Sequence, residues 1–230
     1  NKMKKISKRF YSAILALKYY ILRPTKNRQS IFSNIYKDNY WGSDESVSGV
    51  GSEMDYTIEL RRGIKEIISN FDIKVIVDAP CGDFNWMRSI VESEDISYIG
   101  YDIVDDLIVK NNEQHAGEKI KFFVADICKT ILADCDLLII RDVLFHLSNE
   151  DLLSFKSILK ETKFTYLLVS HHEHQNVVNT DINTGDFREL NVGIPPMNLP
   201  LDKAILSIND SPDWYPIKRV MLLFHRDDIF

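Results

Sequence analysis

Three aspartates stand at the ends of short, β-branched apolar runs, and their spacing is even. Asp78, Asp102 and Asp126 lie 24 residues apart along the chain. Carboxylates that close neighbouring parallel strands can accept hydrogen bonds from ribose hydroxyls or from an exocyclic amine. Gly82 lies in the turn after the first run, where a glycine lets the backbone approach a ligand closely. The alternative for each aspartate is that it caps the following helix, a common role of this residue.

A second set of polar residues follows the fourth apolar run. Arg141 and Asp142 end this run, and His146 comes five residues after Arg141. Imidazole has an unperturbed pKa of about 6.5, which suits a general base that takes a proton from a hydroxyl. We predict His146 as the catalytic base, with Asp142 as an alternative base or as the residue that orients it. The competing interpretations are that His146 packs under the next helix, that Asp142 is a cap and that Arg141 is solvated.

Polar residues also follow the fifth run. His171 and His172 come directly after it, and Asn179, Asp181 and Arg188 lie in a long stretch without helix or strand periodicity. Asp, Asn and Arg side chains suit hydroxyl and phosphate recognition, so we predict these five residues to bind the substrate on an acceptor loop at about residues 171–200. The alternatives are histidines without a role and an ordered surface loop. No metal site is predicted, because adjacent histidines point apart on an extended chain and Mg²⁺ prefers oxygen ligands.

The segment from Trp41 to Ser52 is rich in glycine and serine. It predicts either a lid, with Trp41 stacking on a ring and Ser48 lying near the ligand, or a simple entry loop to a helix. Ser52 is expected to cap a helix over 53–70. The inner face of this helix is expected to carry Ile58, Ile64, Ile67 and Ile68.

The apolar pattern after residue 71 predicts the strands and helices that position these residues. Short β-branched runs alternate with helical periodicity, which is typical of a parallel sheet covered on both faces. Ligands bind such sheets beyond the carboxyl ends of the strands. Strands are predicted at 74–78, 97–102, 120–125, 136–141, 164–170, 204–208 and 220–224, and helices at 31–36, 85–92, 104–116 and 149–161.

The charge is distributed unevenly along the chain. The 230 residues carry a net charge of −6, but residues 1–28 contain nine Lys and Arg and no acid, so the remainder carries −15. An acidic body argues against charge-driven nucleic-acid binding. The apolar spacing in residues 1–23 predicts a basic amphipathic helix. Three alternatives are open for this segment: it packs on its own domain or on a symmetry mate, it lies on an anionic membrane surface, or it is a disordered tail. The expected units are an appendage at 1–30, a helical lid region at 31–70 and a main domain at 71–230.

The strand-end residues resemble a known family. Val75-Ile-Val-Asp-Ala-Pro-Cys-Gly-Asp83, Ile99-Gly-Tyr-Asp-Ile-Val104 and Val124-Ala-Asp-Ile127 are similar to the first three motifs of class I S-adenosylmethionine-dependent methyltransferases. The resemblance implies a Rossmann-like α/β fold with a mostly parallel sheet of seven strands, helices on both faces and an N-terminal helical extension. Pro80 stands where the family usually has its first glycine.

The same resemblance implies a cofactor, S-adenosylmethionine, and the residues that hold it. The turn with Asp78, Pro80, Cys81 and Gly82 would pass under the methionine part. Asp102 with Ile103 would take the ribose hydroxyls, and Asp126 with Ile127 would face the adenine. Arg141 would reach the cofactor carboxylate or an acidic acceptor.

A second resemblance lies partly outside this core. Residues 41–52, 79–87, 141–148 and 179–191 are similar to a bacterial methyltransferase group whose members often sit among genes for surface polysaccharide synthesis. This likeness implies O-methylation of a sugar or related polar metabolite, such as a capsule or surface glycan precursor. The alternatives are N-methylation of a small amine or phosphorylated amino alcohol, an NAD-dependent oxidoreductase and a non-catalytic binding protein. The missing G-x-G-x-x-G turn argues against NAD.

The composition indicates the cellular compartment of the protein. Three cysteines without C-x-x-C spacing indicate a reducing compartment, and no apolar run approaches the roughly 20 residues needed to cross a bilayer. The sequence therefore predicts a cytoplasmic protein with a small-molecule or glycan acceptor. It leaves open a homodimer and peripheral contact of residues 1–28 with the inner face of the membrane.

Overall fold

The computed structural model describes residues 27–173, 177–212 and 218–230. The amphipathic helix predicted over 1–23 lies outside these ranges. None of the helices in the described part of the chain is long and apolar enough to cross a membrane.

The described residues form a sheet of seven strands in the order β3-β2-β1-β4-β5-β7-β6. Strands β1 to β5 are parallel, and β7 runs antiparallel to both β5 and β6. The strands are β1 (Val75–Asp78), β2 (Ser97–Asp102), β3 (Ile120–Val124), β4 (Cys135–Ile140), β5 (Phe164–His172), β6 (Leu206–Asn209) and β7 (Arg219–His225). All seven predicted strands are present, with ends shifted by up to two residues.

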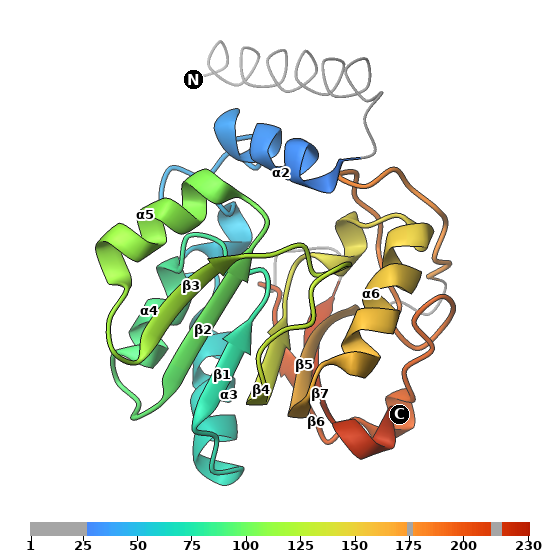
Figure 1. Cartoon of the computed structure of the whole chain (residues 1–230). Helices are drawn as coiled ribbons and strands as arrows, with labels where there is room; N and C mark the ends of the chain where they lie inside the picture. The colour runs from blue at the N-terminus through green and yellow to red at the C-terminus, as the bar shows by residue number, and fades with distance from the viewer. Residues whose placement is uncertain (1–26, 174–176, 213–217) are drawn as a thin grey trace.

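Five α-helices surround this sheet in the described ranges, and one of them lies across its edge. Figure 1 shows α2 (Arg28–Lys37) above the edge where the parallel strands end. The others are α3 (Ile58–Asn70), α4 (Asn85–Val91), α5 (Asp105–His115) and α6 (Asn149–Glu161). Ser148 caps α6, since its hydroxyl accepts the Asp151 N–H at 3.2 Å.

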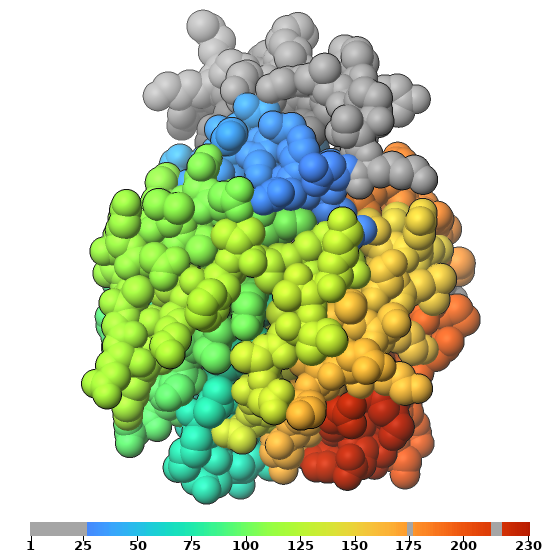
Figure 2. Space-filling view, in the orientation of Figure 1, coloured from blue at the N-terminus to red at the C-terminus, as the bar shows by residue number. Residues whose placement is uncertain are grey.

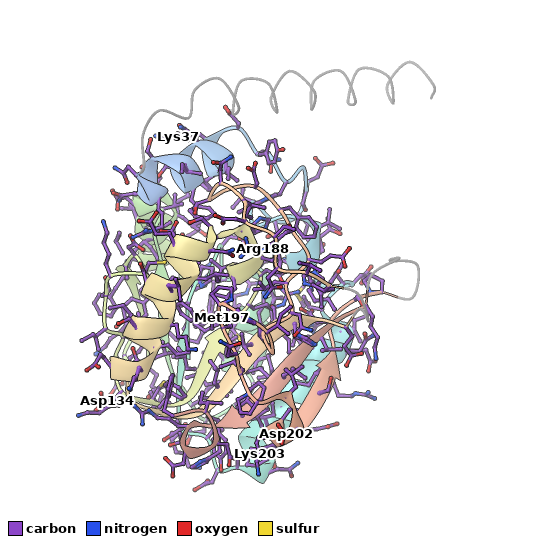
Figure 3. All side chains as sticks on the ribbon, turned by 90° about the vertical axis from the view of Figure 1, so that its right-hand side faces the viewer. Lys37, Asp134, Arg188, Met197, Asp202 and Lys203 are labelled. Carbon is purple, nitrogen blue, oxygen red and sulfur yellow. The ribbon has the colours of Figure 1, made fainter. Side chains whose placement is uncertain are left out.

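Two apolar clusters fill the two faces of the sheet. One cluster joins the sheet to α3, α4 and α5. The other joins it to α6 and to four residues of the long loop after β5: Leu190, Val192, Met197 and Leu199. Figure 3 labels Met197, which lies inside the fold and is fully buried. The loop predicted as an acceptor wall therefore also covers one face of the sheet.

The N-terminal elements differ from their predictions. Helix α3 begins at Ile58, and Ser52 ends a 3₁₀ turn over Val50–Ser52 instead of capping a helix from 53. Ile58 is exposed, and Leu60 takes the buried position. The predicted helix 31–36 extends over Arg28–Lys37, so the expected unit boundary at residue 30 falls inside α2.

The packing of α3 against β6 generates a stability prediction. A Cβ added at Gly63 would lie 2.6–2.9 Å from three side-chain atoms of Ile208. Alanine ordinarily stabilises a helix over glycine by roughly 1 kcal/mol, but overpacking a core costs about 1–3 kcal/mol. We expect Gly63→Ala to lower the free energy of unfolding in urea. The control is Gly117→Ala, where a Cβ meets nothing within 4 Å; equal effects of both changes would contradict the prediction.

Candidate functional site

A cavity of about 450 Å³ opens at the carboxyl ends of the parallel strands. Its walls come from the turn after β1, the ends of β2 and β3, the segment after β4, residues 47–52 and α2. Ten of the eleven predicted cofactor residues line it: Trp41, Ser48, Pro80, Cys81, Gly82, Asp102, Ile103, Asp126, Ile127 and Arg141. The sheet edge thus gathers the residues that the motif spacing placed at strand ends.

Asp102 closes β2 and supports the Gly82 turn. Its carboxylate accepts the Gly82 N–H at 3.2 Å and the Val104 N–H at 3.0 Å, one on each oxygen. Burial raises the pKa of Asp102 to about 6, although these backbone N–H groups favour the ionised form. Each carboxylate oxygen keeps acceptor capacity beyond its one backbone hydrogen bond, which suits a pair of hydroxyls.

Asp78 is the exception among the predicted cofactor residues. It does not line the cavity, and its carboxylate accepts a hydrogen bond from the Tyr98 hydroxyl at 2.8 Å. Burial raises its pKa to about 7, and its Oδ1 has no hydrogen-bond partner within the described part of the chain. Asp78 is therefore buried below the cavity surface, where its carboxylate joins β1 to Tyr98 of β2.

The serine-rich segment is tied to the Gly82 turn through Asp83. The Asp83 carboxylate accepts hydrogen bonds from the Ser46 hydroxyl at 2.8 Å and from the Val47 N–H at 2.9 Å, and Ser48 Oγ accepts the Asp83 N–H at 3.0 Å. Gly82 has a φ of +55°, and a Cβ there would lie 2.2 Å from Ser48 Oγ. The turn therefore needs glycine both for its conformation and for this close approach.

His146 lines the cavity in a defined orientation. Its Nδ1 lies 2.7 Å from the carbonyl oxygen of Asp186. Because a carbonyl oxygen only accepts, Nδ1 carries the proton, and Nε2 of the neutral ring is left as an acceptor. Burial holds the pKa of His146 below its usual value. The rings of Trp41, Phe145 and Phe187 surround it at centroid distances of 5.7, 4.7 and 6.0 Å.

Two arginines and two aspartates form a buried network beside His146. Asp210 accepts hydrogen bonds from Arg141 at 2.9 and 3.0 Å and from Arg219 Nε at 3.1 Å. Asp142 pairs with Arg141 at 3.3 Å and with Arg219 at 3.2 Å. Each arginine is therefore shared by both carboxylates, and the four charges sum to zero. We call this set the four-charge network.

The four-charge network also holds residues 50–56. Arg141 donates to the Gly51 carbonyl at 2.7 Å, and Arg219 donates to the Tyr56 hydroxyl at 3.2 Å. Burial raises the pKa of Tyr56 to about 12, so its phenol stays protonated. Residues 50–56 are in this way attached to the ends of β4 and β7.

Asp142 is poorly suited to the role of base that the sequence allowed it. Burial opposes its ionisation, but the charges of Arg141 and Arg219 outweigh burial and hold its pKa below the usual range. A carboxylate whose pKa is lowered is a weak proton acceptor. Asp142 has a positive φ of 55°, and its N–H donates to Ser170 Oγ at 3.0 Å. No hydrogen bond joins it to His146 among the described residues.

None of the five predicted substrate residues lines the cavity. His171 and His172 are buried, and their Nδ1 atoms accept the N–H groups of Val192 and Leu190 at 3.3 and 3.2 Å. Burial lowers the pKa of His172 to about 4, so the ring remains neutral as this contact requires. Both histidines fasten the long loop to β5.

The other three predicted substrate residues are also part of the loop structure. Asn179 donates to the carbonyls of Asn191 and Pro195, and Asp181 accepts the Asn149 N–H at the start of α6. Arg188, labelled in Figure 3, is buried, and its guanidinium has no hydrogen-bond partner among the residues that the structure describes. Its neighbour Phe187 contributes to the cavity instead.

Several residues that line or support the cavity were missed. They include Arg28, Phe32, Tyr36, Tyr56, Phe145, Phe187, Asp210 and Arg219. The signal for Arg219 was present, since it is a charged residue at the start of the otherwise apolar run Val220–Phe224. Asp210 and Tyr56 carried no such signal, because Asp210 pairs with Arg141 over 69 positions and Tyr56 with Arg219 over 163.

Comparison with solved structures shows a class I methyltransferase fold. The chain matches Burkholderia thailandensis 1,6-didemethyltoxoflavin-N1-methyltransferase with a TM-score of 0.64 and 13% identity, covering 86% of each chain. It matches Synechocystis magnesium protoporphyrin IX methyltransferase with a TM-score of 0.58 and 13% identity, covering 88% of this chain and 99% of that one. The predicted fold class, a mostly parallel Rossmann-like sheet of seven strands, is confirmed.

A third similar structure belongs to a larger protein. Human N-acetylserotonin methyltransferase matches with a TM-score of 0.56 and 13% identity over 86% of this chain, which spans only 60% of the human one. No family model matches the sequence. No curated protein matches it either.

The four-charge network generates a second stability prediction. Asp210→Asn removes one charge from a fully buried side chain and leaves two arginines with one carboxylate. Breaking a buried ion pair from one side costs roughly 3–5 kcal/mol, so we expect a loss of this size in the free energy of unfolding. Asp134→Asn, at an exposed pair with Lys163, should leave stability almost unchanged. Urea unfolding of both variants measures these free energies. Similar small losses of stability in the two variants would contradict the prediction that the four-charge network contributes strongly to stability.

Proposed function

We propose that the protein is an S-adenosylmethionine-dependent methyltransferase that methylates an oxygen of a sugar or related polar metabolite, with His146 as the base. The observation that carries this proposal is the placement of His146. Its Nδ1 is fixed by the Asp186 carbonyl, and its ring faces the same cavity as the Gly82 turn and Asp102. The fold supports the proposal, because the similar solved structures include methyltransferases with bound S-adenosylmethionine or S-adenosylhomocysteine.

The polar and apolar groups that line the cavity fit this cofactor. The Asp102 carboxylate has the acceptor capacity for ribose hydroxyls, and the Gly82 turn presents backbone without a side chain. Ile103 and Ile127 supply apolar surface for a purine, and Asp126 lies beside them for its exocyclic amine. When bound, the cofactor supplies a methyl group already activated on a sulfonium.

The protein's own residues then have three tasks. His146 accepts the acceptor's proton at Nε2, which leaves Nδ1–H in place on the Asp186 carbonyl. Trp41, Phe145 and Phe187 exclude water around the imidazole, which keeps the base and the acceptor oxygen in direct contact. The four-charge network fixes the wall next to His146 and keeps Asp142 ionised.

The choice of acceptor rests on the sequence resemblance of residues 41–52, 141–148 and 179–191. The polar residues of the third segment that were expected at the acceptor do not line the cavity, so we assign acceptor contact to Trp41, Tyr56 and Phe187, which do. A mass-based screen of sugar nucleotides, phosphorylated sugars and amino alcohols identifies the substrate. If methyl is transferred only to amino alcohols, and to their nitrogen, the proposal of O-methylation is wrong and N-methylation takes its place.

Cofactor binding gives the direct test. We expect calorimetry to show S-adenosylhomocysteine binding and no NAD binding. Binding of NAD without any response to S-adenosylhomocysteine would refute the proposal.

The pKa of Asp102 predicts how this binding depends on pH. Only the carboxylate form can accept two hydroxyl donors, and its pKa is raised to about 6. Affinity for S-adenosylhomocysteine should therefore be full above this pH and fall as the pH decreases through about 6. Asp102→Asn should weaken binding about 10-fold or more at pH 8, the effect of losing charge-assisted hydrogen bonds, and should remove the inflection near 6. An inflection that persists unchanged in this variant belongs to another group, such as Asp78.

Replacement of His146 tests its role as base. In His146→Asn the amide nitrogen can replace Nδ1 in the contact with the Asp186 carbonyl, but no proton acceptor replaces Nε2. We expect turnover of a hydroxyl acceptor to fall by about 10²–10⁴-fold, while the Kd of S-adenosylhomocysteine changes little. Because the pKa of His146 is lowered, the wild-type rate should decline only at pH values below about 6.5. Near-normal turnover in His146→Asn would exclude a base at this position.

A further inference from the structure

Helix α2 lies over the cavity and has few apolar contacts with the core, where Phe32 is partly buried. Arg28, Phe32 and Tyr36 of this helix line the cavity. Ile35 is its one buried residue. Figure 2 shows α2 (blue) seated between the surface of α5 (green), the segment after β3 (yellow-green) and α6 (yellow). A helix with so little buried apolar surface depends on its side-chain contacts to stay in place.

The strongest of these contacts are made by Arg28. Its Nε lies 3.1 and 3.0 Å from the two carboxylate oxygens of Asp126, and its Nη2 lies 2.7 Å from Asp126 Oδ2. Its Nη1 donates to Asp151 in the first turn of α6. One guanidinium thus joins α2 to the end of β3 and to α6, in a fork geometry that lysine cannot reproduce.

These three side chains are shielded from water. The exposed fractions of the Arg28, Asp126 and Asp151 side chains are 13%, 18% and 14%. The two carboxylates share this cation. Asp126 has a further, weaker partner in Lys129, whose Nζ lies 3.9 Å away and whose side chain is 74% exposed, so loss of Arg28 would leave the two carboxylates with little compensation. The Cys128 N–H also donates to the Asp126 carboxylate, at 3.0 Å. Arg28 therefore sets the orientation of Asp126.

The opposite end of α2 is attached much more weakly. Lys37 and Asp106 are 3.7 Å apart, and both side chains are 60% exposed. Tyr36 accepts a hydrogen bond from Lys110 at an exposed position. Exposed ion pairs of this kind contribute little to stability. The weak pair at this end of α2 therefore provides a control for the contacts of Arg28 at the other end.

We propose that Arg28 is a positioning residue that latches α2 over the cavity and orients Asp126, so that it governs how long the cofactor stays bound. The proposal rests on the proposed function in one respect, namely that the cavity takes the cofactor with its adenine beside Asp126. Entry and release of the ligand then require the contacts of Arg28 with Asp126 and Asp151 to break and α2 to move aside. The residue comes from the basic N-terminal segment, outside the methyltransferase motifs.

The test compares Arg28→Gln with Lys37→Gln, which removes the same charge from the exposed end of the helix (Figure 3). We expect Arg28→Gln to speed dissociation of S-adenosylhomocysteine about 10-fold, the scale of a lost charge-assisted hydrogen bond, with Trp41 and Trp86 in the cavity wall as fluorescent reporters. Lys37→Gln should stay within about 2-fold of wild type. Arg28→Lys, which keeps the charge without the fork, should give an intermediate rate.

Two further measurements separate a latch from a general loss of stability. In the free protein, hydrogen exchange of the α2 amides should be faster in Arg28→Gln and unchanged in Lys37→Gln. Asp151→Asn, a change outside the cavity, should speed dissociation in the Arg28 protein and add nothing in Arg28→Gln, because both remove the same contact.

The outcomes are distinct. Unchanged dissociation and exchange in Arg28→Gln, equal effects of the two glutamine variants, or additive effects of Arg28→Gln and Asp151→Asn would each overturn the latch. If wild-type protein binds no S-adenosylhomocysteine, the proposed function fails, while the exchange of α2 still decides whether Arg28 holds the helix.

Discussion

The mutual neutralisation of Arg141, Asp142, Asp210 and Arg219 is the interaction on which the rest of the site depends. Charged groups taken out of water are stable only when they are paired and their hydrogen bonds are satisfied. Here the two arginines and two aspartates satisfy each other across β4, β7 and the end of β6. Because the remaining N–H groups of the arginines hold Gly51 and Tyr56, the network fixes the position of residues 50–56 relative to the sheet.

The fold could be predicted from the sequence because each strand has a recognisable residue pattern. Buried parallel strands read as apolar runs, and residues at their carboxyl ends meet at one edge, so Gly82, Asp102 and His146 could be placed in one site from their positions alone. The same reasoning could not find Asp210, since its pairing with Arg141 joins residues 69 positions apart. Such pairs are created by tertiary structure and have no local pattern.

The residues predicted to bind the substrate at the end of β5 and in the loop after it lie outside the cavity, and the histidines show why. His171 and His172 have the chemistry of ligand-binding residues, but backbone N–H groups inside a protein also need acceptors. Leu190 and Val192 lie in a loop without a strand partner for these N–H groups, and the two imidazoles accept them. Residue type alone cannot distinguish the two uses of a histidine.

The contact between the Gly82 turn and Ser48 has a consequence for natural variation. A side chain at position 82 would meet both the hydroxyl and the Cβ of Ser48, at 2.2 and 3.1 Å. Since Ser48 also holds Asp83, a substitution at position 82 would displace the segment that closes the cavity as well as the turn. The residue types at positions 48 and 82 therefore constrain each other. In relatives that keep this site, we expect them to be retained together or exchanged together, although they lie 34 positions apart in the chain.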